Sequence, residues 1–288
     1  MTALFLVFGA FLLLFLLFVL LTAPGHLPKA RTALLTGEFA HRGLYEKNQC
    51  PPENSLPAFA RAAEAGYGIE LDVNLTADGQ IVVFHDDTLR RMCGSARRVN
   101  DCTLAELRAL TLADSGDKIP LFSEVLQTVG GEVPLIVELK ACPRYRELCE
   151  KTHRMLHAYP GPYCIESFLP FIVQWFKKHA PDTVRGQLAM GRKQYRGMPW
   201  YASFSVANLL SNVLTRPHFV AYRIEDARHN LPLTLYKLLG GKLVAWTVHE
   251  MDDQRFAAKK FHCRIFEWYR PKQVKQSDYR EKQTERGC

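Results

Sequence analysis

Residues 68–75 read Gly-Ile-Glu-Leu-Asp-Val-Asn-Leu, and this stretch decides the fold class. Side chains of a strand alternate between its two faces, so Glu70 and Asp72 share one face. The aliphatic residues between and beside them share the other face: Ile69, Leu71, Val73 and Leu75. We expect the aliphatic face to pack against helices and the acidic face to line the interior of a closed barrel.

The rest of the chain repeats this pattern of short apolar strands separated by helices, which favours βαβ units and a parallel sheet. The predicted main strands cover residues 38–41, 68–75, 135–140, 163–166, 184–188, 219–222, 242–248 and 264–266. Residues 81–85 are expected to form a hairpin with the second strand. The pattern predicts an α/β fold, a TIM-type (β/α)8 barrel with a small insertion after the second strand. The alternative is a doubly wound sheet, but the chain lacks its glycine-rich nucleotide loop.

The N-terminus carries no charged side chain from residue 2 to residue 24 and is rich in Leu, Phe and Val. About 20 apolar residues are enough to span a bilayer core, so we predict one uncleaved transmembrane helix. A cleaved signal peptide is the alternative, although it usually has Lys or Arg before a shorter apolar region. Lys29 and Arg31 follow the apolar run, so the positive-inside rule predicts a single-pass membrane protein with a cytoplasmic catalytic domain.

The expected organisation is an anchor over residues 1–24, a linker over 25–36, a barrel over 37–270 and a basic tail over 271–288. An insertion at the barrel mouth is expected over residues 86–120. The net charge of +8 favours contact with anionic lipid headgroups. A nucleic-acid partner is not expected, because the basic tail has the composition of a solvated chain end. The eight cysteines form no CxxC pair, which argues against a zinc site of that kind.

Glu70 and Asp72 would repel each other unless a cation lay between them, and oxygen ligands suit Ca²⁺ or Mg²⁺. Glu138 and Lys140 repeat the spacing in Leu-Ile-Val-Glu-Leu-Lys. Glu138 is therefore a candidate third metal ligand, and Lys140 a candidate contact for a phosphate oxygen. Two alternatives remain open: the first two carboxylates are paired with basic groups or solvated, or Glu138 and Lys140 form an internal ion pair without a catalytic task.

Two histidines end predicted strands close to the acidic residues. Imidazole titrates near neutral pH, so His41 and His85 are candidates for the general base and the general acid. Arg42 offers a planar fork of donors that suits phosphate. Zinc binding by the two histidines is an alternative.

Three further residues have a possible place in the site. Glu53 and Asn54 precede Ser55, the expected N-cap of the helix over residues 56–65. Glu53 is expected to cap the helix, reach the metal or orient a histidine, with Asn54 as a further supporting group. Trp246 is either a plug of the barrel or an apolar wall for the substrate.

Taken in order, these motifs resemble the glycerophosphodiester phosphodiesterase family, and in particular a membrane-anchored member of bacterial type. The resemblance covers about residues 39–266. The motifs that carry it are His41-Arg42-Gly43, Glu53-Asn54-Ser55, Glu70-Leu71-Asp72-Val73, Asp78-Gly79, His85-Asp86, Ile119-Pro120-Leu121, Glu138-Leu139-Lys140, Glu166-Ser167-Phe168 and Trp246-Thr247-Val248.

The resemblance implies one divalent metal ion, Ca²⁺ or Mg²⁺, and hydrolysis of glycerophosphodiesters to glycerol 3-phosphate and an alcohol. It assigns acid–base catalysis to His41 and His85. It assigns metal binding to Glu70, Asp72 and Glu138, and phosphate binding to Arg42 and Lys140. Two other functions remain open, a phospholipase-D-like enzyme that acts on lysophospholipids at the membrane and a non-catalytic lipid-binding barrel.

The chain departs from the family pattern at two places. Cys50-Pro51-Pro52 lengthens the segment between His41 and Glu53. The last predicted strand is followed by Glu267-Trp268-Tyr269-Arg270-Pro271, where many members have a Thr-Asp-Pro ending. The second departure leaves the contribution of the last strand, and the choice of leaving alcohol, without a prediction.

Overall fold

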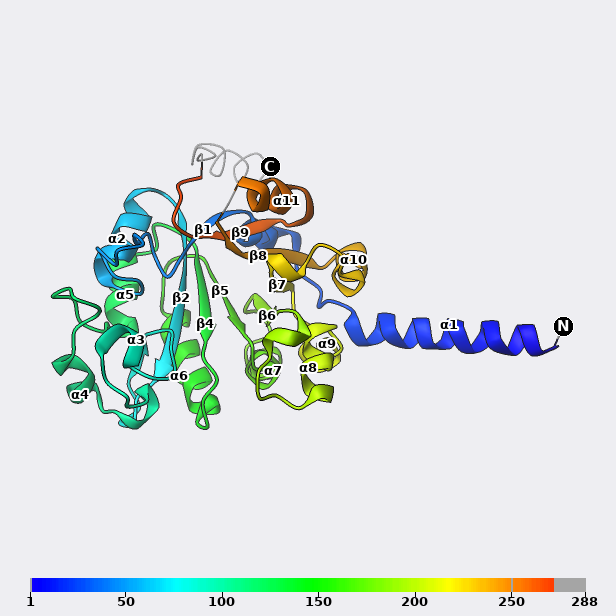
Figure 1. The fold of residues 1–288 in the computed structure, drawn as a ribbon, viewed down its shortest axis with the longest axis horizontal. Helices are drawn as coiled ribbons and strands as arrows, with labels where there is room; N and C mark the ends of the chain where they lie inside the picture. The colour runs from blue at the N-terminus through cyan, green and yellow to red at the C-terminus, as the bar shows by residue number, and fades with distance from the viewer. Residues whose placement is uncertain (1, 250, 272–288) are drawn as a thin grey trace.

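The computed structural model describes residues 2–249 and 251–271. Eight parallel strands form a closed barrel surrounded by helices (Figure 1). The strands are β1 (Gly37–His41), β2 (Gly68–Leu75), β4 (Leu135–Leu139), β5 (Tyr163–Ser167), β6 (Arg185–Ala189), β7 (Phe219–Arg223), β8 (Lys242–Val248) and β9 (Cys263–Phe266). The barrel closes because β1 pairs with both β2 and β9. The predicted TIM-type fold is confirmed, with strand ends within two residues of the predicted ones.

β3 (Ile81–Val83) is antiparallel to β2 and is the predicted hairpin partner. The helices that cover the barrel are α2 (Leu56–Glu64), α5 (Phe122–Val129), α6 (Tyr145–His157), α7 (Pro170–His179), α8 (Trp200–Ala207), α9 (Asn212–Thr215), α10 (Leu231–Leu238) and α11 (Met251–Lys260). The Ser55 side chain caps α2 by accepting a hydrogen bond from the backbone N–H of Ala58.

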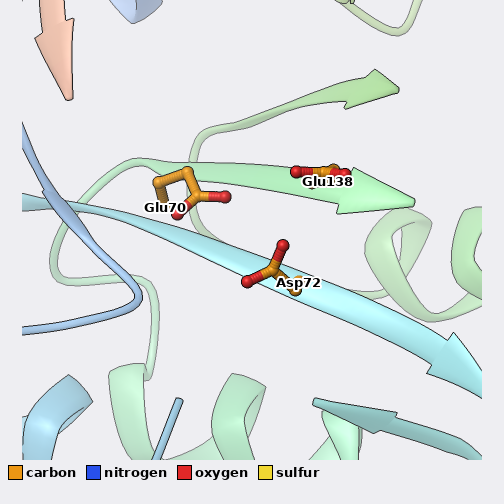
Figure 2. Close-up of side chains that lie close together, drawn as sticks. All are labelled: Glu70, Asp72 and Glu138. Atoms are coloured by element: carbon orange, nitrogen blue, oxygen red, sulfur yellow. The ribbon is translucent and has the colours of Figure 1, made fainter. Parts of the chain in front are cut away.

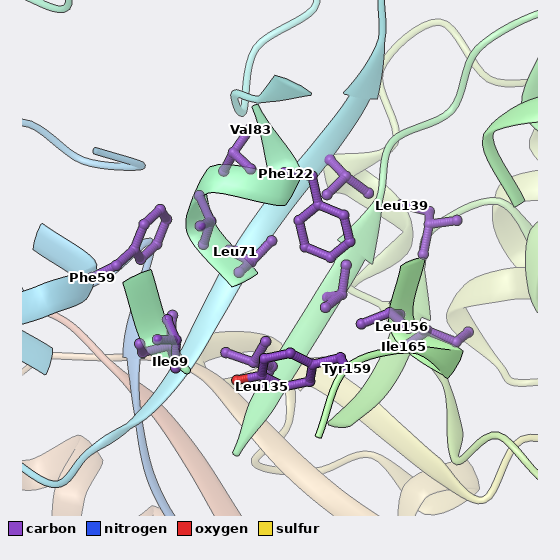
Figure 3. Packing of buried hydrophobic residues seen from close by; sticks show 14 of the residues in the cluster. Phe59, Ile69, Leu71, Val83, Phe122, Leu135, Leu139, Leu156, Tyr159 and Ile165 are labelled. Atoms are coloured by element: carbon purple, nitrogen blue, oxygen red, sulfur yellow. The ribbon is translucent and has the colours of Figure 1, made fainter. Parts of the chain in front are cut away.

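The alternation along β2 divides the core into two layers. The four aliphatic residues of β2 pack outward against the helices, among residues such as Phe59 of α2 and Phe122 of α5 (Figure 3). A separate apolar cluster includes Phe39, Ile136 and Phe219 from alternate positions of other strands. The two acidic residues of β2 therefore face the barrel interior, as the period of two predicts.

Between β3 and α5 the chain forms α3 (Arg90–Cys93), a short 3₁₀ turn (Val99–Asp101) and α4 (Leu104–Ala109). These elements pack on their own apolar cluster, which includes Phe84, Leu89 and Ile119. Thr103 and Glu106 form a capping box at the start of α4. The segment is thus a small folded addition, and it brings Arg91 towards the site described below.

The N-terminal helix α1 (Thr2–Thr22) projects away from the barrel (Figure 1). Its segment Leu4–Thr22 has 19 residues with a mean hydropathy of 3.2, so it is long and apolar enough to cross a membrane. A signal sequence would have the same properties. The expected basic tail over residues 271–288 lies almost wholly outside the described residues.

Candidate active site

Three buried carboxylates from two neighbouring strands meet inside the barrel. Asp72 of β2 is paired in register with Glu138 of β4, and Glu70 lies two residues earlier on β2. Oxygen atoms of the three groups all lie within 4.8 Å of one another. Figure 2 shows the three carboxyl groups beside one another on β2 and β4. The sequence predicted these three residues as one group, and the fold brings them together.

The electrostatics of this group fit a divalent cation. Burial and the neighbouring Asp72 raise the pKa of Glu70 well above its usual value, and burial raises the pKa of Glu138 to about 7. Burial opposes ionisation of Asp72 too, but Lys140, His85 and Arg42 outweigh it and lower the pKa of Asp72. Like charges held this close in a buried site call for a counter-charge, and oxygen-only donors suit Ca²⁺ or Mg²⁺.

Lys140 supplies part of that counter-charge. Its Nζ lies 2.8 Å from Glu138 Oε1 and 3.3 Å from Asp72 Oδ1. The ion pair considered as an alternative from the sequence is therefore present in the structure. It places the ammonium group directly beside the candidate metal ligands, and the contact of Lys140 with a phosphate oxygen stays a prediction.

Glu166 of β5 adds a fourth buried carboxyl group beside Glu138, with which it is paired in register. Its Oε2 has no hydrogen-bond partner among the described residues, and burial and the charge of Glu138 raise its pKa well above the usual value. The sequence indicated Glu166 only as part of a motif. The raised pKa favours the neutral form of Glu166, so this carboxyl group does not add a full negative charge beside Glu138.

Arg42 lies at the end of β1 in a left-handed conformation with φ of 55°. Its backbone N–H donates to Glu70 Oε2 over 3.1 Å, and its side chain reaches Glu53 Oε1 at 2.7 Å. Glu53 also accepts hydrogen bonds from Arg91 at 2.7 and 2.8 Å. The structure thus pairs Glu53 with two arginines, where the sequence led us to expect a cap, a metal contact or a histidine contact.

Asn54 contacts a candidate ligand directly. Its Nδ2 donates to Asp72 Oδ2 over 2.9 Å, and its backbone N–H donates to the Arg42 carbonyl oxygen over 2.9 Å. The side-chain bond fixes the orientation of the Asp72 carboxylate, and the backbone bond ties the loop to the end of β1. This geometry suits the supporting position predicted for Asn54.

His41 ends β1 and is held by a residue that the sequence interpretation did not assign. Its Nδ1 lies 3.1 Å from Glu267 Oε1, and its Nε2 lies 3.9 Å from Glu70 Oε2. Glu267 also accepts a hydrogen bond from the Tyr45 hydroxyl and lies 2.7 Å from His249 Nε2. A glutamate directly after the last barrel strand is a signal that could have identified it, because catalytic groups of such barrels lie at strand carboxyl ends.

The protonation states of His41 and Glu267 follow from their surroundings. Burial opposes ionisation of Glu267, but hydrogen bonds from His249 and His41 outweigh it and lower the pKa of Glu267. Burial and the charge of Arg42 lower the pKa of His41, although Glu267 acts in the opposite direction. Near neutral pH the carboxylate is thus charged and the His41 ring is free to accept a proton.

His85 follows β3, which borders β2 on the same edge as β1, opposite β4. The backbone N–H of Phe84 donates to the Asp72 carbonyl oxygen over 3.0 Å, which places the following residue beside β2. His85 Nδ1 lies 2.6 Å from Asp86 Oδ1, and Arg91 Nε donates to Asp86 Oδ2 over 2.8 Å. Burial and the charge of Lys140 lower the pKa of His85.

Trp246 of β8 belongs to the inner part of the barrel. Its ring meets the ring of Phe168 edge-on at a centroid distance of 5.5 Å. Its Nε1 is buried and has no hydrogen-bond partner among the described residues. The two roles considered for Trp246, a plug of the barrel and an apolar wall for the substrate, both stay predictions.

Comparisons with known proteins agree with this geometry. Residues 41–261 match the model of the glycerophosphoryl diester phosphodiesterase family. The chain is 31% identical over 230 residues to a glycerophosphodiester phosphodiesterase of Caldanaerobacter subterraneus subsp. tengcongensis, covering 74% of this chain and 86% of that protein. It is 28% identical over 251 residues to human glycerophosphodiester phosphodiesterase 1, covering 75% of this chain and 73% of that one.

The fold is also similar to solved structures. An Oleispira antarctica phosphodiesterase, solved in complex with its product sn-glycerol-3-phosphate, has a TM-score of 0.68 with this chain. The match covers 83% of this chain and 95% of that one at 21% sequence identity. At this identity the likeness establishes the barrel fold.

Proposed function

The chain belongs to the glycerophosphoryl diester phosphodiesterase family, and we propose on that basis that it hydrolyses glycerophosphodiesters to glycerol 3-phosphate and an alcohol. One observation carries the proposal: three buried carboxylates meet inside the barrel, and the histidines at the end of β1 and shortly after β3 beside them are each paired with their own carboxylate. In the proposed reaction these groups bind the charged phosphodiester and exchange protons with it. Family membership favours an enzyme over the alternative of a non-catalytic barrel.

In this proposal Glu70, Asp72 and Glu138 hold one divalent cation, Ca²⁺ or Mg²⁺. The bound cation would supply charge neutralisation at the phosphoryl oxygens. Arg42 and Lys140 contact the remaining phosphate oxygens. Arg42 Nε is buried, makes no hydrogen bond among the described residues and lies 3.5 Å from Asp72 Oδ2, so the guanidinium group stands directly beside a candidate metal ligand. Asn54 keeps Asp72 in its orientation while substrate binds.

His41 acts as the general base. With Nδ1–H donated to Glu267, the lone pair of the ring lies on Nε2, which takes the proton of the nucleophile. The nucleophile is water or the neighbouring glycerol hydroxyl. In the second case the hydroxyl oxygen bonds to phosphorus as the alcohol leaves, and water then opens the cyclic phosphate. The lowered pKa of His85 favours its neutral ring in the free site. In this proposal the negative charge of the bound phosphodiester, together with Asp86, raises that pKa so that the ring carries a proton on Nε2. His85 then donates this proton to the oxygen of the leaving alcohol.

The variant Glu267→Gln tests the positioning of His41. We expect kcat to fall by at least about 10-fold, because a neutral amide no longer fixes the ring tautomer. Glu267 raises the pKa of His41, so its neutralisation lowers that pKa. The acid limb of the kcat/KM profile should therefore move to lower pH, as measured in buffers of constant ionic strength.

Two further variants control this experiment. Glu267→Asp should recover part of the rate, and Glu150→Gln, at an exposed glutamate of α6, should leave both the rate and the profile unchanged. A lower rate with an unmoved acid limb would mean that Glu267 only stabilises the fold.

A second candidate activity is phospholipase-D-like cleavage of lysophospholipids, and the apolar helix α1 favours it. We propose that α1 is kept as a single-pass anchor and that Lys29 and Arg31 retain the barrel on the cytoplasmic side. The anchor would hold the barrel close to lipid substrates.

Turnover of glycerophosphocholine and lysophosphatidylcholine by the purified full chain discriminates between the two activities. We expect glycerophosphocholine to give the higher kcat/KM, with glycerol 3-phosphate and choline as products. A strong preference for lysophosphatidylcholine would favour the second activity. Release of phosphocholine would contradict both, because the other ester bond of the phosphate would then be cut.

A further inference from the structure

We infer that the barrel face formed by α8, α9 and α10 lies against the lipid bilayer, with the aromatic side chains of α8 in the headgroup region. The inference rests on the proposed role of α1 as a membrane anchor and goes beyond it. A transmembrane anchor joined by a flexible linker would not fix the orientation of the barrel relative to the membrane. The contacts between the C-terminal end of α1 and the barrel indicate that one face of this barrel is held against the membrane.

The first support is the way in which α1 joins the barrel. Arg216, at the end of α9, donates from Nη1 to the carbonyl oxygens of Leu20 and Ala23 over 2.8 and 3.2 Å. Asn212 Nδ2 donates to the Thr22 carbonyl oxygen over 3.0 Å. These bonds tie the last turn of α1 to α9 without a spacer, and α1 also contacts α10. Figure 1 shows α1 leaving the barrel beside α8, α9 and α10.

The second support is the side chains that α8 exposes. Trp200 is 71% exposed, Tyr201 62% and Phe204 45%. Trp200 and Phe204 are four residues apart and therefore lie on one side of the helix. Trp and Tyr are the residues enriched at membrane–water interfaces, where the ring is partly apolar and its polar atom meets the headgroups.

α10 exposes apolar side chains as well. Its exposed residues are Leu231, Leu238 and, just after the helix, Leu239. The Tyr222 hydroxyl joins the two helices, because it donates to the Ala207 carbonyl oxygen at the end of α8 and accepts from Asn230 Nδ2 before α10. The exposed groups of α8 and α10 thus belong to one packed unit.

The third support is charge. Residues 183–249, which contain all three helices, hold nine lysine and arginine residues and only two acidic residues. Both acidic residues, Glu225 and Asp226, form ion pairs with Arg223. This region therefore has a net charge of +7, and among its basic residues Arg185 is buried against the end of α9. Basic groups beside an apolar surface attract the anionic headgroups of a membrane.

A cavity of about 420 Å³ lies where α1 joins the barrel. Its lining includes His26, Lys29 and Lys242, together with Leu239 at the end of α10. The span ends at Thr22, so this basic cavity lies at the depth of the headgroups. A bilayer fits this face better than a soluble partner does, because any partner seated here would have to share the space with α1.

Tryptophan fluorescence in vesicles tests the orientation of the barrel, since all four tryptophans lie outside α1. The full chain is reconstituted in phosphatidylcholine vesicles with phosphatidylserine, with acyl chains brominated close to the headgroups. We expect part of the emission to be quenched relative to unbrominated vesicles. Trp200→Phe should remove most of this quenching, and Trp268→Phe, at the other exposed tryptophan, should leave it in place.

Quenching that persists in Trp200→Phe, or is lost in Trp268→Phe, would overturn the inference, because another face would then meet the lipid. Absence of quenching in vesicles that carry the protein would overturn it as well. Flotation of the vesicles tests the anchor separately, and failure to float would contradict both the anchor and this orientation. Hydrolysis of glycerophosphocholine by the same sample tests the enzymatic proposal independently of either result.

Discussion

His41→Ala and His85→Ala are each expected to lower kcat by at least about 10²-fold, the usual contribution of one general acid or base. Each ring is paired through Nδ1 with a carboxylate, which leaves Nε2 as the atom that exchanges a proton with the substrate. Alanine removes that atom without changing the metal ligands. Initial rates of choline release from saturating glycerophosphocholine measure the effect.

His229→Ala is the matched control, because this histidine is exposed and lies on the loop before α10. It should retain the full rate, and all three variants should unfold at a similar temperature. A near-normal kcat in either the His41 or the His85 variant would show that the residue has no part in proton transfer.

Asp72→Asn is expected to lower kcat/KM by about 10³-fold or more. A divalent cation contributes several kcal/mol of transition-state stabilisation, and each 1.36 kcal/mol corresponds to a factor of ten in rate. The Asp72 carboxylate also accepts a hydrogen bond from Asn54 and forms ion pairs with Lys140 and Arg42. The asparagine side chain therefore removes a negative charge that three neighbouring groups contact. Calorimetric titration with Ca²⁺ and Mg²⁺ should show weaker binding alongside the lower rate.

Asp114→Asn is the control for this variant, because Asp114 is an exposed aspartate of the segment after α4. It should bind the metal and turn over substrate as the unaltered chain does. Unchanged metal affinity in Asp72→Asn would exclude Asp72 as a ligand, even if the rate were low.

The parts of the fold and site that could be predicted from the sequence are those that follow from the alternation of side chains along a strand. Glu70 and Asp72 alternate with aliphatic residues, and that alternation alone decides which groups face the interior. Glu138 of β4 and Lys140, directly after its end, show the same two-residue spacing. Parallel strands place such groups at one end of the barrel, so the three-carboxylate group could be assembled from the sequence.

Glu267 could not be assigned in the same way, because its contact with His41 depends on closure of the barrel. The two residues are 226 positions apart and meet only because β9 pairs with β1. Arg91 is a similar case, since it lies in the non-repeating segment after β3 and reaches Glu53 through the fold of that segment. Neither contact has a periodic signal in the sequence.

Lys140 shows a different limit of sequence interpretation. The two-residue alternation correctly places the Lys140 side chain on the interior face. There, the neighbouring carboxylates and a substrate phosphate would compete for its positive charge. Their balance depends on distances of a few ångströms. The structure shows the ammonium group with Glu138 and Asp72.

The most direct test of the central claim is the release of glycerol 3-phosphate from glycerophosphocholine by the purified full chain, measured before and after chelation. The account predicts steady release, loss of activity in excess EDTA, and recovery when Ca²⁺ or Mg²⁺ is added back in excess of the chelator. An unchanged rate of release in excess EDTA would contradict it, because Glu70, Asp72 and Glu138 would then have no cation to hold during the reaction.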